Sequence, residues 1–69
     1  MKKGDFVRLI HSRDRDLTTG RIYEVKAAEG DVDTVCGGRV NEGCFISTTD
    51  SGNDFYSSMN GLFGRWELQ

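Results

Sequence analysis

CFISTTDSGNDFYS, residues 44–57, contains the strongest hairpin signal in the chain. Its first half, Cys44 to Thr49, is rich in β-branched and aromatic residues, which favour a strand. Asp50 to Asp54 then combines Asp, Ser, Gly and Asn, the residue types that favour tight turns. Residues 54–57 return as a second strand. This stretch therefore predicts an antiparallel β-hairpin.

Similar short apolar segments, each closed by turn residues, lie on both sides of this hairpin. Further strands are expected at Asp5–Ile10, Arg21–Ala27, Asp33–Cys36 and Arg65–Leu68. Alternation places Val7 and Leu9 on one face of the first strand. No window repeats apolar residues at helical spacing. Five or six strands spaced about 8–12 residues apart predict an all-β barrel or sandwich.

Glycines mark the connections between these strands. Gly20 is expected to close the polar loop from His11 to Thr19 with a positive φ. The stretch from Gly37 to Gly43 is either a long hairpin loop or a bulged connection. Ser58 to Gly64 is expected to be a compact connection with one short 3₁₀ turn, which places Phe63 in the core.

Length and charge limit the kinds of function that this chain can have. The 69 residues suit one domain, 1–69. Its 9 basic and 11 acidic residues give a net charge of −2, which excludes a strongly basic nucleic-acid protein and an acidic nucleic-acid mimic. The sequence contains neither an apolar run of membrane-spanning length nor a signal peptide, so we expect a cytoplasmic protein that does not enter membranes.

Neither a cofactor nor a metal is expected, and catalysis is not expected either. With 2 Cys and 1 His, the chain has too few ligands for a structural zinc site. A calcium loop starting at Asp50 would need Glu at its twelfth position, which is Gly61. His11, Ser12 and Asp14 crowd into one polar loop instead of converging on a reacting atom. Cys36 and Cys44 are expected to be half-buried thiols, and the sequence leaves their pairing open.

Two features point to a partner-binding surface. Residues 1–26 carry seven basic and four acidic residues, whereas residues 27–69 carry two and seven. Arg13 and Arg15 lie in the long polar loop of the basic part, where binding residues are often found. Neighbouring residues on a strand point to opposite faces, so Phe55 and Tyr56 cannot both be in the core, and at least one of Phe6 and Tyr56 should be exposed. We therefore predict a partner-binding site at Arg13, Arg15 and Tyr56.

Three segments resemble a known class of proteins: KGDFVR at 3–8, LTTGRIYEV at 17–25 and GLFGRWEL at 61–68. They resemble the small SH3-like barrel proteins of unknown function that bacteriophages and prophages encode. The resemblance implies a five-stranded SH3-like barrel with a long first loop, a distal hairpin at Asp50 to Asp54 and a last strand carrying Trp66. The chain lacks the Ala-Leu-Tyr-Asp-Tyr type motif of eukaryotic SH3 domains, so polyproline recognition is not expected.

These observations lead to one main functional expectation and two alternatives. The main one is a non-enzymatic binding module, phage- or prophage-encoded, that contacts a bacterial protein as an adaptor or inhibitor. The first alternative is a nucleic-acid-binding SH3-like module. The second is a structural subunit that self-associates through its sheet edges.

Overall fold

The computed structural model describes residues 1–61 and 64–69, and within them the chain is all-β. The described residues form strands and no helix, which confirms the all-β part of the predicted fold class. The strands are β1 (Phe6–Ser12), β2 (Ile22–Glu24), β3 (Ala27–Ala28), β4 (Val32–Asp33), β5 (Gly38–Arg39), β6 (Cys44–Thr48), β7 (Asp54–Ser58), β8 (Asn60–Gly61) and β9 (Gly64–Leu68). The Cα radius of gyration is 10.8 Å, close to the value of about 11 Å expected for a compact chain of this length.

The first sheet contains four strands in the order β2-β1-β9-β8. β1 pairs antiparallel with β2 on one side and with β9 on the other. Val7 and Leu9 of β1 are fully buried, while Phe6 and Ile10 face solvent, as the alternating pattern predicts. The register between β1 and β9 shifts between Leu9 and His11, so the strand continues past a bulge to Ser12.

The second sheet contains the predicted hairpin. β6 and β7 pair antiparallel with Ile46 opposite Tyr56, and β3 pairs with the other edge of β6. The turn between them uses Gly52 at a φ of 93°, a conformation that only glycine adopts easily. The hairpin prediction is therefore confirmed, including its turn.

One run of sequence crosses from the first sheet to the second. Residues 21–27 were expected to form a single strand, but the structure divides this region into β2 and β3. The Val25 amide donates to the Asp5 carbonyl, and the next amide, Lys26, donates to the Ile46 carbonyl, both at 2.8 Å. Consecutive residues thus bond to different sheets, and the chain bends between them.

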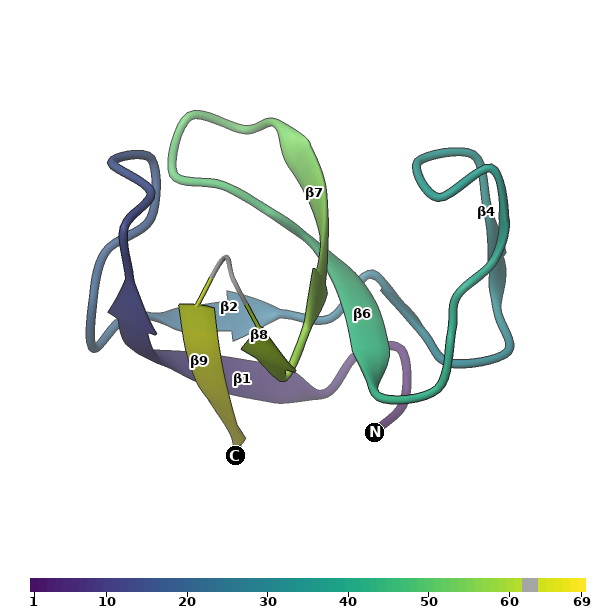
Figure 1. Cartoon of the computed structure of the whole chain (residues 1–69), viewed down its shortest axis with the longest axis horizontal. Helices are drawn as coiled ribbons and strands as arrows, with labels where there is room; N and C mark the ends of the chain where they lie inside the picture. Colours follow the sequence, from purple (N-terminus) through teal and green to yellow (C-terminus); the bar gives the residue numbers. More distant parts are fainter. Residues whose placement is uncertain (62–63) are drawn as a thin grey trace.

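The connection from β3 to β6 forms an arm of its own, residues 31–43. Within residues 1–61 and 64–69, β4 and β5 pair only with each other, and Figure 1 shows this hairpin at the right of the view, apart from β1, β2 and β9. The predicted strand Asp33–Cys36 is wrong, because Thr34 to Gly37 form the turn between β4 and β5. Gly37 turns at a φ of 74°, and Val40 then returns the chain to the core.

Buried side chains from both sheets form the main core. The cluster contains Val7, Leu9, Tyr23, Val25, Ala28, Phe45 and Trp66. Trp66 packs edge-on against Tyr23 and Phe45, and stacks on Phe55 at 5.7 Å between ring centroids. A second, smaller cluster of Ala27, Val40 and Ile46 lies between the second sheet and the arm. The two sheets therefore pack face to face around aromatic rings.

The connection from Ser58 to Gly64 differs from the prediction. It contains β8, which pairs with the start of β9. Residues 1–61 and 64–69 contain no 3₁₀ turn, so that expectation is wrong for the part described. The expected burial of Phe63 lies outside the described residues.

Candidate functional site

The first loop (residues 13–21) is ordered by its own polar side chains. The Ser12 hydroxyl accepts the Asp14 amide at 3.0 Å, and the Asp14 carboxylate accepts the Asp16 amide at 2.8 Å. Such short-range bonds are the reason that Ser and Asp favour turns. Gly20, with a φ of 88°, turns the chain back toward β2, which confirms the prediction for this glycine.

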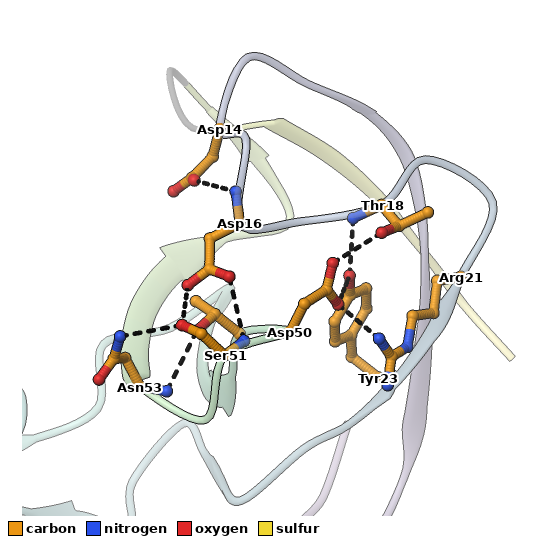
Figure 2. Close-up of polar contacts among 9 residues, drawn as sticks. Asp14, Asp16, Thr18, Arg21, Tyr23, Asp50, Ser51 and Asn53 are labelled. Atoms are coloured by element: carbon orange, nitrogen blue, oxygen red, sulfur yellow. Dashed lines mark hydrogen bonds and ion pairs between the residues drawn. The ribbon is translucent and has the colours of Figure 1, made fainter.

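Asp50 of the distal turn holds the loop from one side (Figure 2). Its carboxylate accepts hydrogen bonds from the Thr18 hydroxyl at 2.6 Å, the Tyr23 hydroxyl at 2.7 Å and the Arg21 guanidinium at 2.7 Å. The Tyr23 hydroxyl also accepts the Thr18 amide at 2.8 Å. One carboxylate thus links three residues at the end of the loop to the turn between β6 and β7.

Asp16 makes the reciprocal connection from the loop to the turn. Its carboxylate accepts the Ser51 amide at 3.0 Å and a hydrogen bond from the Ser51 hydroxyl, as Figure 2 shows. Its carbonyl accepts the Asp50 amide at 2.9 Å. We call this network of Asp16, Thr18, Arg21, Tyr23, Asp50 and Ser51 the clasp. It ties together two segments that lie far apart in the sequence.

The clasp shifts the protonation equilibria of its own groups. Hydrogen bonds from Thr18 and Tyr23, with the charge of Arg21, lower the pKa of Asp50 below its ordinary value. The Ser51 hydroxyl does the same for the pKa of Asp16. Burial, together with the neighbouring Asp50, raises the pKa of Tyr23. Both carboxylates therefore remain charged, and Tyr23 keeps its proton, at neutral pH.

Arg13 and Arg15, two of the three predicted partner-binding residues, lie on the clasped loop. Both are exposed, and neither forms an ion pair with any residue in the described part of the chain. The loop thus presents two exposed guanidinium groups that form no ion pair within the described residues. Sequence inspection identified them because they lie in a long polar loop.

Tyr56, the third predicted residue, lies in a different environment. It is half-buried against the second core cluster, and its hydroxyl accepts the Asn41 amide at 2.9 Å. Phe55, its neighbour, packs against the main core instead, as alternation requires. Phe6 is 49% exposed, so it is the more accessible of the two aromatic candidates.

Arg13 also contributes to a small hollow at the end of the first sheet, which we call the cationic hollow. It has a volume of about 270 Å³ and is lined by His11, Ser12, Arg13, Asn60, Gly61, Gly64 and Arg65. Arg65 was missed in the sequence because it lies on the last strand. Only the pairing of β1 with β9, which sets His11 opposite Arg65, brings it to Arg13.

A larger groove of about 650 Å³ runs along β2. Its charged lining residues are Lys3, Arg21, Glu24, Lys26 and Asp33. Arg21 and Lys26 are already paired, at 2.7 Å to Asp50 and 2.5 Å to Asp54. The Ser47 hydroxyl donates to the Glu24 carbonyl at 2.6 Å, so part of the outer edge of β2 is occupied from within the chain.

Among the described residues, no group of three or more His, Cys, Asp or Glu side chains gathers in a way that could hold a metal ion. Cys36 and Cys44 are free, half-buried thiols, and both pack against the second core cluster. The described part of the chain has no apolar helix of membrane-spanning length.

Comparison of the chain with protein-family models, curated proteins and solved structures found no match in any of the three. Functional inference therefore depends on the residues and their arrangement.

Proposed function

We propose that the two sheets together form one SH3-like barrel. Its five main strands are β1, the bent run of β2 and β3, β6, β7 and β9, with the arm and β8 as additions. Two observations support this. β1 pairs with the last strand, β9, and the bend at Val25 and Lys26 passes from one sheet to the other.

We further propose that this barrel is a non-enzymatic binding module, phage- or prophage-encoded, that contacts a bacterial protein through its first loop. The observation that carries this proposal is the clasp. Asp50 and Asp16 hold the loop against the distal turn while Arg13 and Arg15 face solvent. A loop that is ordered before binding loses less conformational entropy on contact with a partner.

Charge indicates what kind of partner surface suits the loop. Arg13 and Arg15 have no ion pair within the described residues. Exposed charges of this kind steer association with a surface of opposite sign and set its orientation. The partner surface is therefore acidic. The cytoplasmic location of the chain remains a prediction from its sequence.

The test is an affinity pull-down from a bacterial lysate, with and without nuclease, read by mass spectrometry. The wild-type chain is compared with Arg13→Glu/Arg15→Glu and with a control, Lys2→Glu/Lys3→Glu, which makes the same change in net charge at the N-terminal end. We expect a protein that resists nuclease, binds the control and is lost from the loop variant. Capture that is unchanged in the loop variant contradicts the loop assignment.

Other outcomes point to the alternatives. If nuclease treatment removes the captured proteins, the result favours a nucleic-acid-binding module. Such binding should weaken steeply as the salt concentration rises. If the wild-type chain captures only itself, sedimentation at high concentration distinguishes a self-associating subunit from a monomer.

A further inference from the structure

The strand register brings the residues of the cationic hollow together. At the end of the first sheet, Arg65 of β9 is opposite His11 of β1 on one side and Asn60 of β8 on the other. Directly opposite residues in an antiparallel pair lie side by side on one face of the sheet. All three side chains are exposed. Arg13 follows directly after β1 and lines the same hollow.

Glycines form the neighbouring row of the sheet, where Gly64 lies opposite Ser12 and Gly61. A Cβ on Gly64 would lie 2.5 Å from the His11 carbonyl oxygen, much closer than such atoms can approach. A Cβ on Gly61 would lie 2.3 Å from the Ser58 hydroxyl. Gly64 therefore cannot carry a side chain unless β1 moves, and both glycines contribute backbone to the lining of the hollow.

The ionisable side chains that line the hollow all belong to basic residue types: His11, Arg13 and Arg65. Neither arginine is ion-paired within the part of the chain that the structure describes. The nearest carboxylates in sequence, Asp14 and Glu67, are not among the residues that line the hollow. The hollow is thus a local cationic site on a chain whose net charge is −2.

We propose that the cationic hollow binds a phosphoryl group carried on a side chain of the partner protein, an inference that rests on the proposed function. A phosphorylated side chain has a charge of about −1.5 to −2 and three acceptor oxygens. The hollow supplies enough hydrogen-bond donors for these oxygens: two guanidinium groups, an imidazole and an amide. Each guanidinium group can donate two parallel hydrogen bonds to phosphate oxygens. A single carboxylate has fewer acceptor oxygens than a phosphoryl group, so it would leave more of these donors without a partner.

A phosphomonoester fits the hollow better than a nucleic-acid backbone does. A polyanion needs a continuous series of cations along its length. Here the acidic residues Asp14 and Glu67 flank the cationic residues in sequence, and the hollow occupies one end of one sheet. The geometry suits one compact dianion.

The test is an NMR titration of the whole chain at constant ionic strength with inorganic phosphate, O-phosphoserine or a short oligothymidine, and with chloride as the control ion. We expect phosphate and phosphoserine to shift the Asn60, Gly64 and Arg65 resonances in a saturable way. Arg13→Gln and Arg65→Gln should each weaken this binding about tenfold, the order of one charge-assisted contact. Lys2→Gln, an exposed position that does not line the hollow, should not change it.

Three results overturn the inference: shifts that chloride reproduces, affinity unchanged in both variants, or tighter binding of the phosphodiester than of the monoester at this hollow. Arg65 is exposed, so its variant should fold, and a thermal melt checks this.

The pull-down is independent of this titration. If phosphate fails to bind while partner capture still depends on Arg13 and Arg15, only the phosphoryl inference is wrong. If phosphate binds while capture is indifferent to the loop, the proposed function is wrong.

Discussion

Trp66 is the side chain at which the two sheets meet. It lies opposite Leu9 within the first sheet, and its ring contacts Phe45 and Phe55 of the second. Only 7% of its surface is exposed. Because it contacts strands from both sheets, its burial links their stability.

Trp66→Ala should lower the free energy of unfolding by about 3–5 kcal/mol, the range for a large buried aromatic residue. Urea titration followed by circular dichroism measures the loss. Trp66→Phe is the matched control. It should lose less, because the indole Nε1 has no hydrogen-bond partner among the described residues. A cooperative melt with little loss for the alanine variant would contradict the core role and make Trp66 a binding residue instead.

Gly64→Ala should destabilise the pairing of β1 with β9. The added Cβ would meet the His11 carbonyl oxygen at 2.5 Å and the Ser12 Cβ at 3.2 Å, so the strands must separate. We expect a loss of about 1–3 kcal/mol, as for other overpacked sites. Gly38→Ala is the control, since nothing lies within 4 Å of its added Cβ. Equal melting temperatures for the two variants would show that β9 can shift to accept the added Cβ without a loss of folding stability.

At the scale of elements, the clasp determines how the first loop sits on the distal turn. Within the described residues no strand pairing joins the two segments, so side chains make the connection together with one backbone bond, from the Asp50 amide to the Asp16 carbonyl. Asp16 and Asp50 each accept several hydrogen bonds across it. The sequence indicated that both segments are turns. It did not indicate that their carboxylates bond to each other's segment, because that depends on how the sheets pack.

The clasp should make folding stability sensitive to acid. The pKa of Asp16 and the pKa of Asp50 are both lowered in the folded chain. A carboxylate of this kind stabilises the folded state above its unfolded pKa, and that contribution is lost as pH falls through the folded pKa. The melting temperature should therefore fall once pH drops below about 4.

Asp50→Asn tests the cause of that acid dependence. The variant should be less stable than wild type at pH 7, and its melting temperature should fall less steeply between about pH 4 and 2, where aspartates take up protons. Glu42→Gln, which changes an exposed carboxylate outside the clasp, should keep the wild-type slope. An identical slope in all three proteins would mean that Asp50 does not contribute to the acid sensitivity.

At the scale of the whole molecule, the two sheets share the main core. Tyr23 of the first sheet and Phe45 of the second both contact Trp66, and the bend at Val25 and Lys26 joins the sheets covalently and by hydrogen bonds. The arm is less embedded. Val32 on its outer strand is 71% exposed.

Because of this shared core, both sheets should unfold together. We expect one calorimetric transition with an enthalpy of about 50 kcal/mol, the average for a chain of this size near 60 °C. Near- and far-ultraviolet circular dichroism should give the same midpoint. Two separated transitions, or a calorimetric enthalpy far above the van't Hoff value, would contradict a single cooperative core.

The local signals in the sequence were strong enough to predict several elements. Alternation at Val7 and Leu9 identified β1, and the turn residues around Gly52 identified the β6–β7 hairpin. These features depend on side-chain period and on local backbone preference, so neighbouring residues are sufficient to predict them. The same local reasoning failed at Asp33–Cys36. Asp33 ends β4, opposite Gly38 of β5, and the residues after it form the turn between these two short strands.

The sequence by itself determined the all-β class, the buried face of the first strand and the polar loop that carries Arg13 and Arg15. Only the tertiary structure decided where the second strand bends, how Asp16 and Asp50 join loop to turn, and that Arg65 lies at the hollow with Arg13. The reason is physical. Side-chain alternation and turn preference act between neighbouring residues along the chain. Strand register and sheet packing bring together residues that are far apart in the sequence, and no local pattern marks which of them will meet.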